Sequence, residues 1–265
     1  MHTDVQSFAV AHLLRRPAAH RVGPFVAGFD PATTSPYVNY ATPVPGAEPT
    51  ARDVTELIAA FRARALTPRL EFAPDAAPGV ESALRRAGFA TEAEHEYLVC
   101  TPATLAVPHS SPEPEPKPGG EPVPWPRVRV EAPVTEADYV ALDTALAEAF
   151  GGAWAPSPEG AARLRRTAEG GGAVRFVRAP DGGCAGGALC SAPAEGTAEL
   201  AGVGTLPAHR GRGIAAAVTA SLAEALFARG ARSVWLEYSG EGSRRVYERV
   251  GFRPGGRRLY LTLEG

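Results

Sequence analysis

One stretch, from Glu199 to Phe252, constrains this chain more than any other. It opens with a predicted strand at 199–205, turns at Pro207, and reaches the run Arg210–Ala215, which starts a long alanine-rich helix. Glycines in such a run let a ligand approach the backbone closely, and the free N–H groups at a helix start favour an anion. Two arginines in the run add positive charge and forked donors. The pattern therefore predicts a site for a phosphorylated ligand.

Two common phosphate-binding motifs do not account for this run. Gly211–Ala216 satisfies the G-x-G-x-x-G/A pattern of dinucleotide-binding folds, follows a predicted strand and opens a helix. It comes late in the chain, however, whereas a dinucleotide-binding fold begins with this motif. No Gly-Lys-Ser/Thr follows, so the run is not a P-loop either.

Three segments in order resemble the GNAT family of acetyltransferases. Arg210–Ala215 is similar to the family's Arg/Gln-x-x-Gly-x-Gly/Ala loop, which binds the pyrophosphate of acetyl-CoA. Val203–Pro207 is similar to its central strand and turn, and Tyr247–Phe252 to its Tyr-x-x-x-Gly-Phe signature. The resemblance covers residues 127–265. It implies an α/β (α+β) class and the GNAT fold, a mixed, mostly antiparallel twisted sheet flanked by helices.

The resemblance also implies acetyl-CoA as the cosubstrate and assigns the residues that hold it. Backbone groups of Val203, Gly204 and Thr205 would pair with the pantetheine arm, in a strand whose glycines suit a bulge or a close approach. The pyrophosphate would be cradled by Arg210, Gly211, Arg212, Gly213, Ile214 and Ala215. Many family members carry Asn where this chain has Gly240, and Ser243 is expected to supply a substitute hydroxyl.

Two residues are candidates for moving protons. Tyr247 is the expected general acid, because a phenol with a pKa of about 10 keeps its proton at neutral pH. The resemblance also implies Glu199 as the general base, because GNAT histone acetyltransferases carry a Glu at the start of this strand, and a partly buried carboxylate there can accept a proton directly or through water. A core aromatic and an ordinary strand-end charge are the alternatives for these two residues, and both stay open.

The resemblance also implies that the helix and loop after residue 135 shape the acceptor site. Tyr139 and Phe150 fall on the apolar face of a predicted helix and are expected in the core. Trp154 lies in the Gly/Pro-rich segment 151–156 and is the better candidate for a pocket. The sequence predicts no metal site, because its cysteines and histidines lack the spacing of metal ligands.

Residues 69–100 repeat the pattern of residues 234–263. Each runs strand, helix, Gly-Phe and strand, which favours a second, degenerate GNAT-like unit at the N-terminus. This unit lacks an Arg-Gly-x-Gly loop and has Leu84 where Tyr247 stands, so it is expected to bind no acetyl-CoA. Two ordinary strand–helix–strand units that look alike are the alternative.

A proline-rich segment separates the two halves. Between Pro108 and Pro126 the prolines recur too often for a helix or a central strand, which favours an extended, semi-stiff linker. A Pro-rich recognition ligand is the alternative for this segment. The expected domains are therefore a degenerate GNAT-like domain at 1–105, a linker at 106–126 and a catalytic GNAT domain at 127–265.

The composition and charge of the chain exclude several classes of protein. The chain has 265 residues, 45% of them hydrophobic, and a net charge of −2, which argues against a general nucleic-acid binder. The scattered cysteines, the absence of a long apolar run and the absence of a leader pattern indicate a cytoplasmic protein with no membrane partner. A homodimer stays open.

The expected function is therefore acetyl-CoA-dependent N-acetyltransfer to the primary amine of a small molecule or peptide, by direct transfer. The alternative from a different class is a non-catalytic acyl-CoA-binding regulatory or sensor protein. The departure at Gly240 keeps that alternative open.

Overall fold

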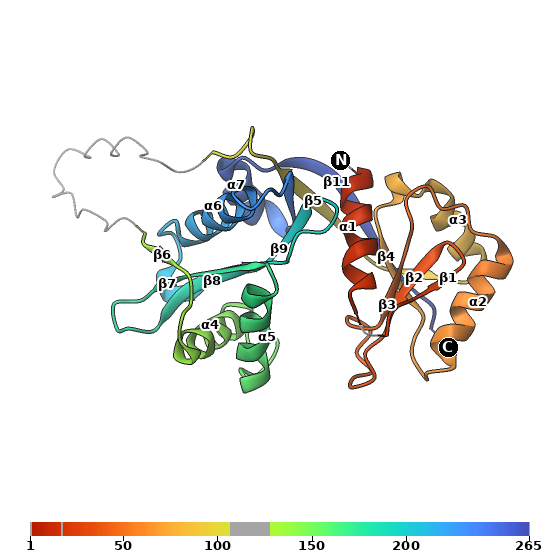
Figure 1. Ribbon diagram of the computed structural model, residues 1–265, viewed down its shortest axis with the longest axis horizontal. Coiled ribbons are helices and arrows are strands. Elements are labelled where there is room, and N and C mark those ends of the chain that lie inside the picture. The colour runs from red at the N-terminus through yellow and green to blue at the C-terminus, as the bar shows by residue number, and fades with distance from the viewer. Residues whose placement is uncertain (1, 17, 107–127, 265) are drawn as a thin grey trace. The chain divides into compact units, whose positions relative to one another are not determined.

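The computed structural model describes residues 2–16, 18–106 and 128–264 (Figure 1). The chain forms two compact units, which are described one at a time. The first comprises Met1–Val99, Ala194–Thr197 and Pro254–Gly265, and the second Cys100–Pro193 and Ala198–Arg253. Of the predicted linker 106–126, all but Ala106 lies outside the described residues. The division into domains at 1–105 and 127–265 stays a prediction.

The strands of the first unit follow the order β1-β2-β3-β4-β11-β5. They are β1 (His20–Val22), β2 (Phe25–Gly28), β3 (Tyr40–Pro43), β4 (Arg69–Phe72), β11 (Arg253–Thr262) and β5 (Ala90–Cys100). The pairs β1–β2, β2–β3 and β4–β11 are antiparallel, whereas β3 and β4 run parallel. Strand β11, the last in the sequence, thus pairs with β4, and Leu259 lies opposite Phe72.

Helices cover both faces of this sheet. They are α1 (His2–Leu14), α2 (Ala51–Arg62) and α3 (Pro78–Arg86). Successive side chains of a strand point to opposite faces. In β2, Phe25 and Ala27 join the core cluster formed with α2 and α3, whereas Val26 packs with Val10 and Leu13 of α1. The sequence of Val5–Leu14 is compatible with a strand or a short helix, and the structure shows a helix there, α1.

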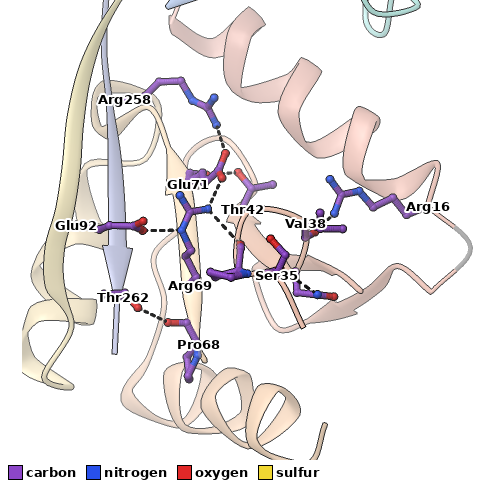
Figure 2. Close-up of polar contacts among 12 residues, drawn as sticks. Arg16, Ser35, Val38, Thr42, Pro68, Arg69, Glu71, Glu92, Arg258 and Thr262 are labelled. Atoms are coloured by element: carbon purple, nitrogen blue, oxygen red, sulfur yellow. Dashed lines mark hydrogen bonds and ion pairs between the residues drawn. The ribbon is translucent and has the colours of Figure 1, made fainter. Parts of the chain in front are cut away.

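The α1 side of the sheet carries charged residues instead of a purely apolar layer (Figure 2). Leu70 and Phe72 of β4 belong to the apolar core, and the alternate residues Arg69 and Glu71 form ion pairs. The Arg69 Nε lies 2.5 Å from a Glu92 carboxylate oxygen, and Arg258 Nη2 of β11 lies 3.5 Å from Glu71 Oε2. The Arg69 and Arg258 side chains are only 4% and 6% exposed. This cluster, which we call the buried ion cluster, ties β11 to β4.

A buried asparagine organises the loop between β2 and β3. The Asn39 side chain donates to the carbonyl oxygens of Thr33 and Ser35 at 2.8 and 3.1 Å and accepts from the Asp30 N–H at 2.8 Å. These bonds replace a strand ladder over residues 30–39. The run Tyr37–Ala41 predicts a strand, but β3 starts only at Tyr40, because Asn39 and the residues before it are engaged in this loop.

The strands of the second unit follow the order β10-β9-β8-β7-β6. They are β6 (Val130–Glu131), β7 (Ala173–Arg178), β8 (Cys184–Cys190), β9 (Thr197–Thr205) and β10 (Ser233–Glu237). The pairs β6–β7, β7–β8 and β8–β9 are antiparallel. The run Asp181–Gly183 predicts a hairpin turn, and the structure confirms it between β7 and β8, with Gly182 at φ +87°.

Helices also lie on both sides of the second unit's strands, with α4 and α5 on one side and α6 on the other (Figure 1). They are α4 (Glu136–Ala149), α5 (Pro158–Glu169), α6 (Ile214–Phe227) and α7 (Gly240–Val250). The run Thr135–Asp138 predicts a capped helix start. The cap is confirmed, because Thr135 Oγ1 accepts from Asp138 N and the Asp138 carboxylate accepts from Thr135 N. No helix among the described residues is both long and apolar enough to cross a membrane.

Candidate active site

The strand β9 is bulged in its second half. Gly187 and Leu189 of β8 are two residues apart, but their partners Gly204 and Ala201 are three residues apart. One extra residue therefore sits in β9, and Gly202 there adopts φ +63°. A bulge leaves backbone groups outside the regular ladder and bends the strand. The sequence-based expectation of a bulge at these glycines is confirmed for Gly202.

Gly204 serves a different purpose from Gly202. It is buried, and a Cβ there would lie 2.9 Å from Leu146 Cδ2 and 3.0 Å from Ala149 Cβ. The end of α4 can therefore pack directly on β9 only over a glycine. Val203 and Thr205, on either side, are half-buried, so this end of β9 stays accessible.

The run after β9 forms an exposed loop that leads into α6. A single 3-10 turn, η2 (Pro207–His209), is followed by Arg210, Gly211, Arg212 and Gly213, all of them exposed. Gly211 and Gly213 both have φ +77°, which explains why glycine is needed there. A Cβ at either position would meet no atom within 4 Å, so the space beside the loop is open to a ligand.

Arg210 is anchored by two backbone carbonyl groups. Its Nε donates to the Thr205 oxygen at 3.2 Å, and its Nη2 donates to the Ala149 oxygen at 3.4 Å. The loop is thereby fixed to the end of β9 and to the end of α4. A guanidinium has five N–H donors, so two bonds do not exhaust its capacity. The Nη1 of the second arginine, Arg212, lies 3.3 Å from His209 Nδ1.

The start of α6 completes an anion-binding geometry. Gly213 is its N-cap residue and supplies no side chain to cap the helix. The N–H groups of the first turn, in Ile214, Ala215 and Ala216, lack carbonyl partners within a helix and carry its positive end. Ile214 is 5% exposed and anchors the helix in the core. This arrangement suits a pyrophosphate, and the binding of one by Arg210–Ala215 stays a prediction.

Tyr247 lies near the end of α7 and is 8% exposed. Burial raises the pKa of its phenol to about 12. The helix ends in a Schellman motif, in which Phe252 N donates to Tyr247 O and Gly251 N to Glu248 O, both at 3.1 Å. Gly251 has φ +102°. The Gly-Phe signature therefore has a structural reason, because it stops the helix immediately after the tyrosine.

The first unit repeats this motif without the tyrosine. Helix α3 ends at Gly88 with φ +93°, and Phe89 N donates to the Leu84 oxygen at 3.1 Å. Leu84 thus occupies the position that Tyr247 has in α7, and it is fully buried in the apolar core. A leucine has no proton to donate, so this unit lacks the candidate acid.

Glu199 sits near the start of β9, at the end away from the phosphate loop. It is half-buried, and its backbone N–H bonds to Ser191 Oγ at 3.0 Å. Its charge acts on the Cys190 thiol. Burial is the larger cause that raises the pKa of this thiol, and the negative charge of Glu199 is the second. Six residues separate Glu199 from Thr205, which corresponds to about 20 Å of strand. The strand length therefore separates the candidate base from the anion-binding loop.

Ser243 and Gly240 lie in the first turn of α7. The Ser243 hydroxyl lies 2.6 Å from Ser239 O and 2.9 Å from Gly240 O, so its proton is engaged by its own helix. The hydroxyl oxygen can still accept a hydrogen bond from a ligand. Gly240 has φ +76°, a conformation that Asn tolerates best among the other residues, which accounts for Gly at a position where the resembling proteins carry Asn.

The burial of the aromatic residues around α4 differs in part from the sequence prediction. Tyr139 is buried as expected. Phe150 is 45% exposed, because it follows the last turn of α4 and the chain reverses at Gly151 and Gly152. Its ring contacts that of Trp154, with centroids 5.5 Å apart. The prediction of Phe150 as a core residue is wrong, and Trp154 lies at the surface, 37% exposed.

The sequence analysis missed one residue of this region. Asp143 is 2% exposed and accepts from Ser157 N at 2.9 Å, which fixes the end of the loop that carries Trp154. A charged residue at a predicted core position was the signal that could have identified it, since Asp143 falls four residues after Tyr139 on the apolar face of α4.

Among the described residues, no group of three or more His, Cys, Asp or Glu side chains is arranged to hold a metal ion.

Comparisons with known proteins identify the family and the fold. Residues 139–252 match the model of the acetyltransferase (GNAT) family. The chain matches no curated protein sequence. A solved GCN5-related N-acetyltransferase from Kribbella flavida has a TM-score of 0.75 and 22% identity, covering 100% of this chain and 96% of its own.

Two further solved structures are similar. A GCN5-related N-acetyltransferase from Sphaerobacter thermophilus has a TM-score of 0.58 and 19% identity, covering 91% of this chain and 76% of its own. A tandem GNAT protein from the clavulanic acid biosynthesis pathway has a TM-score of 0.62 and 13% identity, covering 99% and 87%. At these identities the likeness shows the fold. Together with the family match, it identifies residues 139–252 as a domain of the GNAT family of acetyltransferases.

Proposed function

We propose that this protein is an acetyl-CoA-dependent N-acetyltransferase that acts on a primary amine of a small molecule or peptide. One observation carries the proposal. The bulged strand β9 leads into an exposed Arg-Gly loop at the uncapped start of α6, and the space beside both loop glycines is open. Phosphate oxygens would find backbone N–H groups and guanidinium donors together there.

The residues that would hold acetyl-CoA lie along β9 and the loop. Backbone groups of Val203, Gly204 and Thr205 would pair with the pantetheine arm, because the bulge before Gly204 interrupts the ladder with β8 and bends this end of the strand. Residues 210–215 would hold the pyrophosphate, and Ser243 would accept a hydrogen bond. Bound there, acetyl-CoA supplies an acetyl group already activated as a thioester.

Tyr247 would act on the leaving sulfur. Since the pKa of its phenol is raised to about 12, the group keeps its proton throughout the neutral range. Complete transfer to a thiolate, whose thiol has a pKa of about 8.5, is uphill by about 3.5 pKa units, or roughly 5 kcal/mol. A hydrogen bond from the phenol to the sulfur is therefore its first contribution, and the proton follows as the carbon–sulfur bond breaks.

Glu199 would serve the other reactant. An amine attacks only after losing a proton, and a half-buried carboxylate on β9 can accept that proton directly or through water. The first unit would take no part in this chemistry, because it has Leu84 in place of the tyrosine.

The test is the substitution Tyr247→Phe. Turnover, followed as amine-dependent thiol release, should fall about 10²- to 10⁴-fold, while calorimetry shows unchanged acetyl-CoA binding. Tyr139→Phe is the matched control, because Tyr139 is also a buried tyrosine of the second unit but packs in the α4–α5 core. Unchanged turnover in Tyr247→Phe would remove that residue from the mechanism. Acetyl-CoA binding without turnover of any amine would instead favour a non-catalytic acyl-CoA-binding regulator.

A further inference from the structure

Two aromatic side chains, Phe150 and Trp154, meet at the surface of the second unit. They are 45% and 37% exposed, and their rings are tilted by 34° with centroids 5.5 Å apart. Rings that meet at a surface form an apolar patch, and such a patch marks a binding site more often than a scattered apolar residue does. We call these two residues the aromatic pair.

The aromatic pair adjoins the strand and the loop that are proposed to hold acetyl-CoA. Phe150 Cε2 lies 3.5 Å from the position that a Cβ of Gly204 would take, so its ring lies against the bare backbone of β9 just after the bulge. Arg210 Nη2 donates to the oxygen of Ala149, the residue before Phe150. The pair therefore stands where the stretch proposed for the pantetheine arm meets the phosphate loop.

The loop that carries Trp154 is fastened at both ends. At its start, Gly152 N donates to Ala147 O at 2.8 Å. At its end, the buried Asp143 accepts from Ser157 N at 2.9 Å. A surface that is held in place beforehand loses little conformational entropy when a ligand binds to it.

Charge distinguishes the parts of acetyl-CoA that this surface can receive. Residues 150–157 include both rings and no charged side chain, whereas residues 210–213 include two arginines. In acetyl-CoA the nucleotide part carries the phosphates, and the pantetheine arm is uncharged. One methylene away from the pyrophosphate, the arm has an apolar branch, a carbon that bears two methyl groups. The adenine lies on the other side of the pyrophosphate from this branch.

We infer that Phe150 and Trp154 pack against the dimethyl branch of the pantetheine arm and so help to hold acetyl-CoA at the end of β9. This inference rests on the proposed function, because it takes acetyl-CoA as the ligand of that site. Contact between the methyl groups and the two rings removes apolar surface of both partners from water. The aromatic pair thus supplies an apolar contact that the backbone of β9 and the arginines of the loop cannot supply.

Two ligands test the inference: CoA and its nucleotide part, 3′-phosphoadenosine 5′-diphosphate, which keeps every phosphate but lacks the arm. Both affinities are measured by calorimetry, that of the nucleotide in competition with CoA. Phe150→Ala and Trp154→Ala should each weaken CoA binding about tenfold or more and change the nucleotide affinity by less than about twofold. Trp154→Phe should keep the CoA affinity within about threefold of the wild type, because it retains a flat apolar ring.

Val140→Ala is the matched control. Val140 is 46% exposed and belongs to the same helix, α4, but it lies about 15 Å along the helix from Phe150. It should change neither affinity. Thermal unfolding of each variant should stay close to that of the wild type, because the substituted side chains are exposed.

The other outcomes contradict the inference in different ways. Equal losses for CoA and the nucleotide would assign the aromatic pair to the adenine, and an unchanged CoA affinity with a raised KM for the amine would assign it to the acceptor. An unchanged CoA affinity alone overturns the inference as well. A nucleotide that does not compete with CoA would refute the phosphate loop as its site, and this inference with it.

The same experiment separates this inference from the proposed function. A wild-type protein that binds no acetyl-CoA refutes the proposed function first. A protein that binds CoA but acetylates no amine refutes the proposed catalysis alone, and the two affinities still decide whether the aromatic pair holds the arm.

Discussion

Removing the charge of Glu71 should destabilise the protein far more than removing an exposed carboxylate. Glu71 is 12% exposed and is shared by Arg69 and Arg258, whose side chains are 4% and 6% exposed (Figure 2). Breaking a buried ion pair by removing one partner costs about 3–5 kcal/mol, because the remaining charge stays out of water. Arg69 keeps its bond to Glu92, so we expect Glu71→Gln to cost about 3 kcal/mol, the low end of that range.

The assay is urea unfolding followed by circular dichroism, with the free energy extrapolated to water. Glu94→Gln is the matched control, because Glu94 pairs with Arg257 between the same kinds of side chains, but at the surface with 47% and 43% exposure. Exposed pairs contribute about 0–1 kcal/mol. If Glu71→Gln loses no more stability than Glu94→Gln, the reasoning about the buried ion cluster is refuted.

Three more predictions concern a helix end, a buried histidine and the cosubstrate. Gly251→Ala should destabilise the protein far more than Gly88→Ala in thermal unfolding. Both glycines have positive φ, but a Cβ at Gly251 would lie 1.9 Å from the backbone oxygen of Thr104, whereas a Cβ at Gly88 would lie 3.4 Å from the flexible end of a leucine. Equal losses of stability in the two variants would contradict the steric argument. Burial lowers the pKa of His12 to about 4, below the unfolded value of 6.5, so the unfolded chain binds a proton first as the pH falls. The free energy of unfolding should therefore decrease between pH 6.5 and pH 4, and His12→Phe should flatten that slope in urea titrations at several pH values. Calorimetric titration should give one acetyl-CoA per chain, and two equivalent sites would refute the view that the N-terminal unit is degenerate.

The parts of the fold that the sequence predicts are those with local causes. The run from β9 through the loop to α6 is such a part, because glycines, arginines and an apolar helix stripe lie next to one another in the chain. The capped start of α4 at Thr135 and the glycine stops of α3 and α7 are local as well. In each case the backbone hydrogen bonds are made within a few residues.

Features that depend on residues far apart in the chain could not be predicted from the sequence. The partner of β11 is β4, and the two residues that meet there, Arg258 and Glu71, are 187 positions apart. Helix α1 is apolar around much of its circumference, so its periodicity could not separate a helix from a strand. The exposure of Phe150 depends on where α4 stops, which is decided by the turn at Gly151 rather than by the apolar pattern before it.

The position of β11 has a consequence for how the protein is made. The strands β1 to β5 are all synthesised by residue 100, but β11, the remaining strand of the first unit, follows about 150 residues later. At about 5–20 residues per second, this is a wait of roughly 8–30 seconds. During that time β4 lacks its antiparallel neighbour and presents an unpaired edge, the kind of edge that pairs with other chains. The newly made N-terminal half should therefore depend on chaperones until its last strand arrives.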